Sequence, residues 1–373
     1  MGRIRYVLAI NPGSTSTKLA VYGEDILLHQ KVIRHTHEEL AEYPTIKDQI
    51  PYRLELISNA LLEMDFQKPL SAVIGRGGLT HPLPGGVYKV DHPMIYDLEN
   101  ATRQHASNLG AILAARIAYR YTDCIPLIAD PVVVDEMTEK AHISGHPDMP
   151  RLSIFHALNQ KAVARQYCRS IGLLYDELNI IVCHMGGGVS VGAHEKGRVI
   201  DVNNALDGEG PFSPERSGTL PAGQLIDYIF KKQLTYTQAK KLIVGQGGLM
   251  AHFGTTNVPD ILRKVRDGDH HAATVIAAME YSIAKYIGMC AVALMGKVDA
   301  ILLTGGIANN STITENIKLQ VQWIAPVHVL PGEDEFEAMR VNAFRVLDNP
   351  SEAKEYVPAD KNVANSSVHQ FLK

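Results

Sequence analysis

The stretch VLAINPGSTSTKLAVY, residues 7–22, decides the fold of this chain. It consists of two apolar runs on either side of a polar turn, which is typical of two buried strands joined by a hairpin. A hairpin needs one Gly or Asn at its turn, but this turn combines Asn, Gly, Ser, Thr and Lys. Polar turns at strand ends expose backbone N–H groups that bind anions. The stretch therefore predicts a buried hairpin that holds a negatively charged ligand.

A second stretch, IIVCHMGGGVSVGAHE at residues 180–195, repeats this pattern. At a constant offset of 173 residues, Leu8 aligns with Ile181 and Gly13 aligns with Gly186. A short turn and a third apolar run follow in both cases. The chain is therefore predicted to contain one hairpin-led unit twice. A chance match between short apolar and Gly-rich segments is the alternative.

Strands and helices alternate in the rest of the chain. Apolar periodicity predicts strands at 71–74, 125–129 and 300–303, and helices at 100–121, 156–168, 225–232, 272–294 and 335–347. Such alternation is typical of an α/β protein with helices layered on sheets.

Composition narrows the class of protein. A chain of 373 residues with 46% hydrophobic and 20% charged residues suits a globular protein of two domains. A net charge of −4 argues against nucleic-acid binding through a broad basic face. The apolar segment 272–294 carries Glu280 and Lys285, which favours a core helix over a membrane span. The four cysteines form no CxxC pair, and no apolar leader precedes the first strand, so we expect a cytoplasmic protein.

Three polar turns follow predicted strands, at residues 11–18, 184–190 and 305–311. Together they predict a phosphate chain held between two lobes, although each turn alone could be a simple hairpin or loop. The P-loop pattern GxxxxGK[ST] and the dinucleotide pattern GxGxxG are both absent. The phosphate site is therefore expected to be of another kind.

Five motifs in order resemble those of the acetate and butyrate kinases: INPGSTSTK, RLSIFHALN, IIVCHMGGGVSV, PERSGTLP and LLTGGIANNS. The resemblance extends over roughly residues 6–347. Two further stretches, IGRGGLTHPLPGGVY and GQGGLMAHFGTTNV, resemble the butyrate kinase branch of that family. The family belongs to the group of kinases that share the actin and sugar-kinase fold.

The resemblance implies an α/β fold of two duplicated actin-like (ribonuclease H-like) domains with an interdomain cleft. We expect an N-terminal lobe at residues 1–150, onto which a helix at about 338–350 packs back. A nucleotide-binding lobe is expected at 151–337 and a polar tail at 351–373. The family also suggests a homodimer or a higher homo-oligomer.

The activity implied is reversible transfer of phosphate from ATP to butanoate or a branched short-chain acid, giving ADP and an acyl phosphate, with Mg²⁺. A carboxylate is already ionised at neutral pH, so the enzyme must bring two anions together rather than remove a proton. That chemistry calls for cations. The alternatives are a sugar-type kinase of the same fold and a non-catalytic actin-like nucleotide-binding protein.

Candidate catalytic residues follow from this chemistry. Arg76 ends a strand among glycines, and its guanidinium matches a carboxylate in bidentate geometry. The resemblance implies the same role, and a surface arginine in a turn is the alternative. By resemblance, His156 and Arg216 stabilise the transferring phosphoryl group, and Asp130 orients metal-bound water or Arg76. His105 matches an active-site histidine of the family, with packing on a helix face as its alternative.

The resemblance also implies nucleotide and metal contacts. Mg²⁺ is expected near Asn11 and Glu335, with Glu333 and Asp334 as alternatives. The nucleotide and its phosphates are expected at Ser14, Lys18, His184, Gly186, Gly187, Gly188, Gly306, Asn309 and Asn310.

Two departures from the family pattern concern specificity. Residues 257–260, Asn-Val-Pro-Asp, stand where acetate kinases have an Asp-aromatic-Arg run, which puts adenine contacts there in doubt. Gly77 and Gly78 stand where acetate kinases have branched apolar residues. We expect them to widen the acid pocket opposite Phe155, at about 0.8 kcal/mol for each extra buried methylene. Turn formation by an Arg-Gly-Gly sequence is the alternative.

Overall fold

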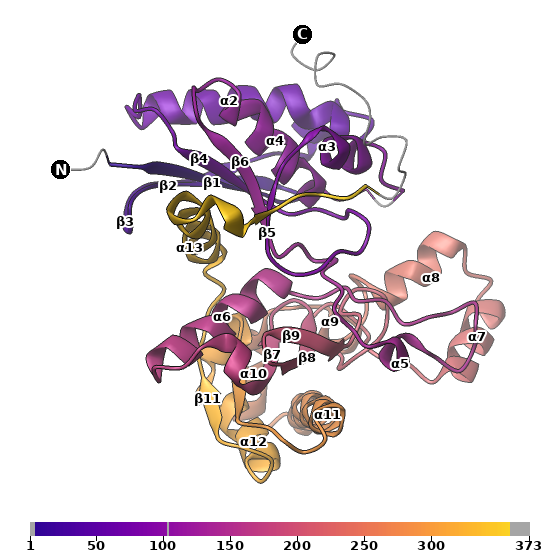
Figure 1. Ribbon diagram of the computed structural model, residues 1–373. Coiled ribbons are helices and arrows are strands. Elements are labelled where there is room, and N and C mark those ends of the chain that lie inside the picture. The colour runs from indigo at the N-terminus through magenta and orange to yellow at the C-terminus, as the bar shows by residue number, and fades with distance from the viewer. Residues whose placement is uncertain (1–3, 103, 359–373) are drawn as a thin grey trace. The chain divides into compact units, whose positions relative to one another are not determined.

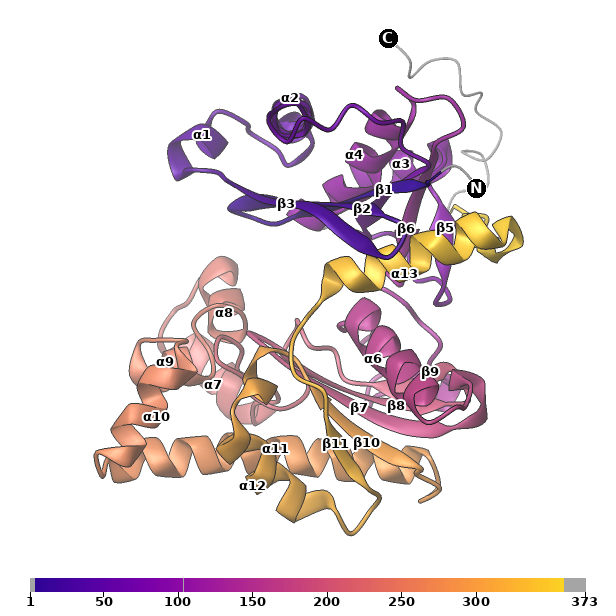
Figure 2. The same ribbon diagram turned by 90° about the vertical axis from the view of Figure 1, so that its left-hand side faces the viewer.

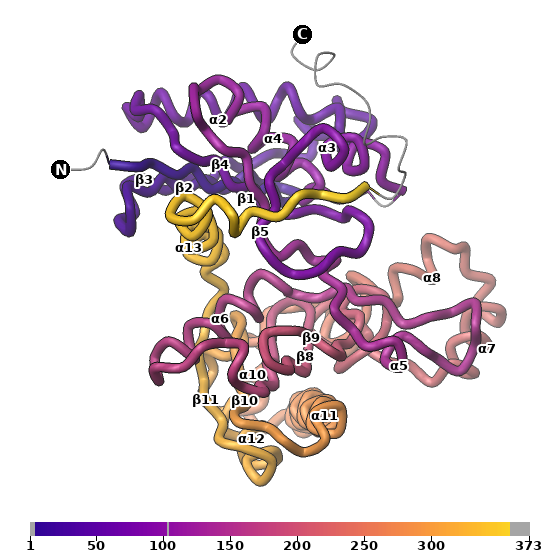
Figure 3. Tube along the Cα trace, viewed as in Figure 1, coloured from indigo at the N-terminus to yellow at the C-terminus, as the bar shows by residue number. Residues whose placement is uncertain are grey.

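The computed structural model describes residues 4–102 and 104–358, and it forms two compact units. Unit 1 combines the chain up to Val134 with the chain from Asp334 onward, and unit 2 comprises Asp135–Glu333. Figure 3 shows how the yellow C-terminal segment rejoins the indigo and purple part of the chain to complete unit 1.

Unit 1 contains a seven-stranded sheet in the order β12-β5-β6-β4-β1-β2-β3 (Figure 1). Its strands are β1 (Tyr6–Pro12), β2 (Ser16–Gly23), β3 (Ile26–Arg34), β4 (Ala72–Arg76), β5 (Val87–Lys89), β6 (Ile125–Ala129) and β12 (Ala353–Lys354). Its helices are α1 (His37–Ala41), α2 (Ile50–Glu63), α3 (His92–Glu99), α4 (Leu109–Ala118) and α13 (Glu335–Asp348), with 3₁₀ turns η1 (Lys47–Gln49), η2 (Ala106–Asn108) and η5 (Pro350–Glu352).

Helices cover both faces of this sheet. All seven residues of β1 are buried, as its continuous apolar run predicts. α2 and α4 pack on one face through a cluster that includes Ile57, Leu113 and Leu8. α13 contacts β1, β4 and β6 on the other face (Figure 2). The N-terminal end of α13 is thereby fixed to the sheet of unit 1.

Unit 2 contains a five-stranded sheet in the order β11-β10-β7-β8-β9. Its strands are β7 (Asn179–Met185), β8 (Val189–Glu195), β9 (Arg198–Val202), β10 (Ala300–Thr304) and β11 (Val327–Val329). Its helices are α5 (Glu139–His142), α6 (Ala157–Ser170), α7 (Ala222–Lys231), α8 (Tyr236–Ile243), α9 (Leu249–Phe253), α10 (Val258–Arg266), α11 (His270–Ala293) and α12 (Ser311–Val321), with 3₁₀ turns η3 (Tyr175–Glu177) and η4 (Gly306–Asn309).

Alternate residues of the strands in unit 2 face two different cores. Ile180 and Val182 pack with α6, whereas Ile181 and Cys183 pack with α11 and α12. Within the described residues, α11 is the one helix long and apolar enough to cross a membrane. Its buried residues form the centre of the second core, as expected for a core helix.

The two sheets confirm the predicted duplication. β1 starts at Tyr6 and β7 at Asn179, while β2 starts at Ser16 and β8 at Val189, so the offset is 173 residues in both cases. Each hairpin is antiparallel, and its first strand pairs in parallel with a later one, β4 in unit 1 and β10 in unit 2. The α/β class and the duplicated sheet order therefore agree with the actin-like fold expected from the sequence.

The helix predicted at 100–121 is wrong in its first half. α3 ends at Glu99, and α4 begins only at Leu109. Between them His105 has extended backbone angles and accepts a hydrogen bond from the backbone N–H of Ser107 through Nδ1, at 3.1 Å. An imidazole that caps the following turn stops the helix from extending toward the N-terminus.

The unit boundary lies at Val134 and Asp135, whereas the sequence placed it at residue 150. Residues 135–150 belong with unit 2 because Arg151 ties them to its sheet. Its Nη1 donates to the carbonyl of Ala141 at 2.8 Å and to Asp201 Oδ1 at 2.8 Å.

The segment predicted as a polar tail is partly built into the fold of unit 1. Ala353 and Lys354 form β12 and pair with β5. Tyr356 is buried and its hydroxyl donates to Asp97 Oδ2 at 2.7 Å. The tyrosine ring is buried as an apolar group, and its hydroxyl supplies a hydrogen bond at the edge of the sheet. The rest of the predicted tail, from residue 359, lies outside the described residues.

A buried arginine fixes the start of β2. Arg53 on α2 has no exposed surface, and its guanidinium donates to Gln49 Oε1 at 2.9 Å and to Thr17 Oγ1 at 2.9 Å. Burial lowers the pKa of Arg53 to about 10, so it remains charged at neutral pH. Burial and the Arg53 charge also lower the pKa of His35 to about 4. Thr17 accepts from Arg53, which leaves its hydrogen for the neutral ring of His35 at 2.8 Å.

We predict that Arg53→Met destabilises the protein by about 3 kcal/mol, because it leaves Gln49 and Thr17 as buried polar groups without their donor. Chemical denaturation with a spectroscopic readout measures this. Arg34→Met on β3, where the side chain is exposed, serves as the control and should change stability by less than about 0.5 kcal/mol. Equal stability of the two variants would contradict the prediction.

Candidate functional site

In unit 1, a carboxylate joins two of the residues predicted from the sequence. Glu335, the first residue of α13, lies 3.1 Å from Arg76 Nη2 through Oε1. Its Oε2 accepts a hydrogen bond from Asn11 Nδ2 at the end of β1. Asn11 is buried, while Arg76 and Glu335 keep part of their side chains exposed. The structure therefore brings together the predicted acid-binding cation and both predicted metal contacts.

The three consecutive acidic residues at the start of α13, Glu333, Asp334 and Glu335, have different partners. Asp334 caps the helix, because its Oδ1 accepts from the backbone N–H of Glu337 at 2.8 Å. Glu333 belongs to unit 2, where its Oε1 accepts from the N–H of Gly306 at 3.4 Å. Glu335 is the one of the three that contacts Asn11, which favours it over the two alternatives.

The turn between β1 and β2 presents its polar side chains to solvent. Gly13 N–H donates to the carbonyl of Ser16 at 2.7 Å, which closes the turn. Ser14 and Lys18 are exposed, and Thr17 beneath them is fully buried. The hydroxyl and the ammonium are therefore available to an anion, while Thr17 anchors the turn from below.

Asp130 and His105 occupy loops of unit 1. Asp130 is buried with φ of 37°, a left-handed conformation that is strained for a residue with a side chain. Its Oδ1 accepts from the backbone N–H of Gly86 at 2.7 Å, so it holds the loop before β5. His105 is exposed and precedes the helix. The alternative of packing on a helix face is therefore wrong for His105.

The pocket expected from Gly77 and Gly78 is not open at these two positions. A Cβ on Gly77 would lie 2.6 Å from Pro131 Cβ, and a Cβ on Gly78 would lie 2.5 Å from Asn108 Cα. Both glycines allow neighbouring chain segments to approach closely. Gly77 and Gly78 therefore do not widen the acid pocket as predicted, and instead allow close packing against Pro131 and Asn108.

In unit 2, a polar side chain from another residue lies against each of the three glycines of the β7–β8 turn. A Cβ would lie 2.7 Å from Glu333 Oε1 at Gly186, 2.6 Å from Glu215 Oε1 at Gly187, and 1.9 Å from Arg216 Nη1 at Gly188. Any larger residue would displace these groups. The Gly-rich turn is thus a surface on which two carboxylates and one guanidinium lie against the backbone.

Arg216 is held over this turn by a carbonyl. Its Nη1 donates to Ala205 O at 2.7 Å, and its Nη2 lies 3.9 Å from Glu215 Oε1. Burial lowers the pKa of the Arg216 guanidinium, and the Glu215 charge opposes this shift. The buried Nε has no hydrogen-bond partner among the described residues. This cation is only weakly paired, which suits a site that receives an anion.

His156 and His184 stack on each other with ring centroids 3.8 Å apart and planes 14° from parallel. His156 precedes α6 and is half-buried, and His184 ends β7 and is buried. His184 Nδ1 bonds Asn159 Oδ1 at 2.7 Å, and its Nε2 lies 3.1 Å from Glu333 Oε1. The two predicted histidines therefore form one pair beside the Gly-rich turn.

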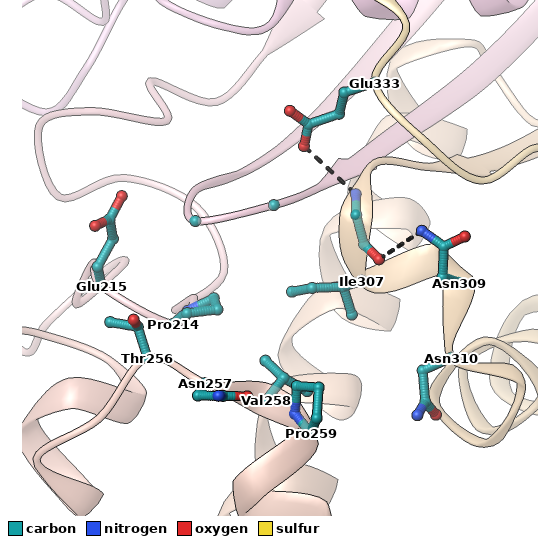
Figure 4. Close-up of a pocket in the computed structure, with 13 residues that line it drawn as sticks. Pro214, Glu215, Thr256, Asn257, Val258, Pro259, Ile307, Asn309, Asn310 and Glu333 are labelled. Atoms are coloured by element: carbon teal, nitrogen blue, oxygen red, sulfur yellow. Dashed lines mark hydrogen bonds between the residues drawn. The ribbon is translucent and has the colours of Figure 1, made fainter. Parts of the chain in front are cut away.

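A pocket of about 520 Å³ in unit 2 contains most of the predicted nucleotide contacts. It is lined by Gly186, Gly187, Gly306, Asn309 and Asn310. Figure 4 shows the hydrogen bond that Asn309 donates to the backbone carbonyl of Gly306. His184 and Gly188 lie in the same β7–β8 hairpin but outside the lining. A volume of this size suits a ligand as large as a nucleotide base with its ribose.

Pro214, Glu215 and Thr256 also line the pocket, although they were not predicted as nucleotide contacts. Asn257, Val258 and Pro259, where the missing arginine of the acetate kinase pattern puts adenine contacts in doubt, form one wall with Thr256. Asn257 also caps α10 by accepting from the N–H of Asp260 at 3.4 Å. The Asn-Val-Pro sequence itself, a cap followed by Pro at the first helical turn, is the signal that could have located this helix start.

No group of three or more His, Cys, Asp or Glu side chains gathers as a metal site within the described residues. The oxygen atoms of Asn11 and Glu335 are nevertheless of the type that Mg²⁺ prefers. Two protein oxygens fit a Mg²⁺ ion that takes its other ligands from water and phosphate.

Comparisons with known proteins identify the family to which this chain belongs. The Acetokinase family matches residues 151–327. "Probable butyrate kinase" of Bacteroides thetaiotaomicron is 51% identical over 91% of this chain and 97% of its own length, and "Butyrate kinase 2" of Clostridium acetobutylicum is 49% identical over 94% and 99%. The crystal structure of Porphyromonas gingivalis acetate kinase superposes with a TM-score of 0.76 at 20% identity, covering 92% of this chain and 100% of that one. The chain therefore belongs to the acetokinase family.

Proposed function

We propose that this protein is a short-chain fatty acid kinase that transfers the terminal phosphate of ATP to a carboxylate. The products are ADP and an acyl phosphate, and the reaction is reversible. Relatives named butyrate kinase, about half identical over nearly their whole length, support this activity. The observation that carries the proposal is the presence of two cations of the kind this reaction needs. Arg76 pairs with the partly exposed Glu335, and Arg216 lies against the Gly-rich β7–β8 turn. A non-catalytic nucleotide-binding protein would have no use for this combination.

We assign the acid to unit 1. The substrate carboxylate is ionised at neutral pH and needs a cation rather than a base. Arg76 offers a guanidinium whose partner, Glu335, is a partly exposed carboxylate on a helix end. A substrate carboxylate can replace that partner on Arg76 without leaving a buried charge unpaired. Asp130 keeps the loop before β5 in place and takes no part as a base.

We assign the phosphates and the nucleotide to unit 2 and to the β1–β2 turn. Phosphoryl transfer depends on charge placed around the transferring group. Arg216 and His156 supply donors to its oxygens, and Ser14 and Lys18 supply a hydroxyl and an ammonium. The pocket lined by Gly306, Asn309 and Asn310 holds the nucleoside. We propose His105 as a further contact to the substrate from its exposed loop.

Mg²⁺ fits the pair of oxygens on Asn11 and Glu335. When bound, it would neutralise charge on the phosphate oxygens. Asn11 and Glu335 would hold the ion, and Arg76, which pairs with Glu335 through its other oxygen, would remain beside it.

Butanoate or a branched four-carbon acid is the proposed acceptor. The names of the relatives that are half identical support this choice, and Gly77 and Gly78 do not.

We also propose that the enzyme is a homo-oligomer. Tyr281, Met289 and Val292 on α11 are large side chains that remain exposed, although the opposite side of this helix is buried. Burying such residues against a second copy would remove apolar surface from water. Light scattering coupled to size-exclusion chromatography measures the mass in solution.

A cytoplasmic location is proposed because the four cysteines are free thiols. Three of them are buried, and burial raises the pKa of Cys183 and Cys290. Unpaired cysteines of this kind are usual in a reducing compartment.

The activity is tested by trapping acyl phosphates as hydroxamates in the presence of MgATP and acetate, propanoate, butanoate, 2-methylpropanoate, pentanoate or a sugar. We expect the highest rate with butanoate or 2-methylpropanoate and none with the sugar. A maximum with acetate would overturn the proposed acid but keep the reaction. Binding of nucleotide without any acyl phosphate would overturn the reaction itself.

We predict that Arg76→Ala lowers kcat/KM for butanoate about 100-fold, because it removes the guanidinium that pairs with the carboxylate. Arg76→Lys keeps the charge but cannot form the bidentate contact, so its kcat/KM for butanoate should fall nearly as much. Steady-state kinetics with varied butanoate measure both variants. Arg120→Ala, at a surface arginine of unit 1, is the control. Unchanged kinetics in both Arg76 variants would refute the assignment.

We predict that Glu335→Gln raises the Mg²⁺ concentration needed for half-maximal activity by about 10-fold to 100-fold, because a neutral amide replaces the charged carboxylate that is proposed to contact the ion. The KM for butanoate should not rise, since the amide competes less well for Arg76. Glu337→Gln on the same helix, where the carboxylate pairs with Arg340, is the matched control. A Mg²⁺ requirement equal in both variants would argue against Glu335.

A further inference from the structure

A buried network of polar side chains lies behind His156 in unit 2. Gln160 on α6 and Ser190 and His194 on β8 have no exposed surface. Tyr175 in η3 closes the network at its far end. The network includes the backbone carbonyl of Ser190, which can only accept a hydrogen bond. From this atom the donor and the acceptor of each following hydrogen bond can be assigned.

The carbonyl of Ser190 orients the Gln160 amide. Gln160 Nε2 lies 3.0 Å from Ser190 O and 2.8 Å from Ser190 Oγ. The atom facing a carbonyl must be the amide nitrogen, so both of its hydrogens point to Ser190. Gln160 Oε1 then faces away and accepts from His194 Nε2 at 2.9 Å.

The orientation of Gln160 also fixes His194. Its Nε2 carries a hydrogen, and burial holds the pKa of His194 well below its usual range. The ring is therefore neutral, and Nδ1 accepts from the hydroxyl of Tyr175 at 2.6 Å. Gly192 is part of this arrangement, because a Cβ there would lie 2.5 Å from Gln160 Oε1.

The hydrogen bonds of Ser190 in turn determine which nitrogen of His156 carries the hydrogen. Its Oγ accepts from Gln160 Nε2 and, at 3.5 Å, from the backbone N–H of His156. Its one remaining contact among the described residues is with His156 Nδ1 at 2.8 Å. The hydroxyl has a single hydrogen, and His156 Nδ1 is the acceptor that it reaches. A hydrogen on Nδ1 would instead leave the buried hydroxyl hydrogen without an acceptor.

We propose that Ser190 and Gln160 are positioning residues that hold His156 in the tautomer with its hydrogen on Nε2. In that tautomer His156 offers an N–H to an oxygen of the transferring phosphoryl group, a use that rests on the proposed function. In the other tautomer Nε2 would carry a lone pair, which repels the same oxygen. A misplaced ring hydrogen is known to be costly when an imidazole acts at a reaction centre.

The first test needs no variant. The full-length protein labelled with ¹⁵N-histidine is examined by a two-bond ¹H–¹⁵N correlation spectrum, with His156 assigned by its absence in His156→Gln. We expect His156 to show a protonated Nε2 and an unprotonated Nδ1. A protonated Nδ1 would overturn the proposal. Because the spectrum needs no turnover, this result is independent of whether the protein makes acyl phosphate.

Variants test the two positioning residues. Ser190→Ala and Gln160→Met should give a mixture of His156 tautomers and lower kcat about 10-fold to 100-fold, with KM for ATP within about threefold. Ser190→Thr keeps a hydroxyl and should restore both the tautomer and most of kcat. Ser58→Ala in unit 1 is the matched control. A Ser190→Ala protein with an unchanged His156 tautomer would overturn the role of Ser190.

Discussion

In a buried hairpin, the backbone N–H groups of the turn have no partner in the strand pairing of the sheet. The rest of this structure depends on how these groups are satisfied. The backbone N–H groups of the turn must find acceptors. In unit 1 the turn after β1 is filled with hydroxyl-bearing residues, and in unit 2 the turn after β7 is reduced to three glycines. Each turn satisfies one of its own N–H groups, Gly13 through the carbonyl of Ser16 and Gly186 through that of Gly188. Duplication of one hairpin thus provides the two turns at which we propose that anions bind.

The two arginines near these turns have partners that a ligand could replace. Arg76 pairs with Glu335 at a helix end, and Arg216 lies 3.9 Å from Glu215. Partners of this kind keep each cation tolerable in the absence of ligand, and an anionic ligand can take their place. Arg53 shows the opposite design, since its donors are committed to neutral oxygens in the interior. The partly exposed arginines are therefore the ones that we propose bind a ligand, whereas the buried Arg53 stabilises the fold.

The sequence predicted the hairpins and their duplication, because burial on both faces leaves long apolar runs. It also placed four of its five predicted helices, those that match α6, α7, α11 and α13, to within three residues at each end. It failed where the answer depends on a distant contact. An alanine-rich run could not reveal that His105 caps a turn, and Gly77 could not reveal that Pro131 fills the space beside it. The bond from Gln160 to Ser190 joins residues 30 apart on a helix and a strand, so no local pattern encodes it.

The duplication extends to one buried hydroxyl in each unit. Thr17 and Ser190 are separated by the 173-residue offset of the hairpins, and both are fully buried. Each accepts a hydrogen bond from a helix side chain, Arg53 in one case and Gln160 in the other, and each contacts a histidine ring nitrogen at 2.8 Å. In unit 1 that ring, His35, is buried and serves the fold. In unit 2 the ring, His156, is partly exposed. Equivalent hydroxyls can therefore order a buried structural histidine in one copy and, as we propose, a functional one in the other. The two copies differ in the ring nitrogen that is contacted, Nε2 of His35 and Nδ1 of His156, and in the exposure of the ring.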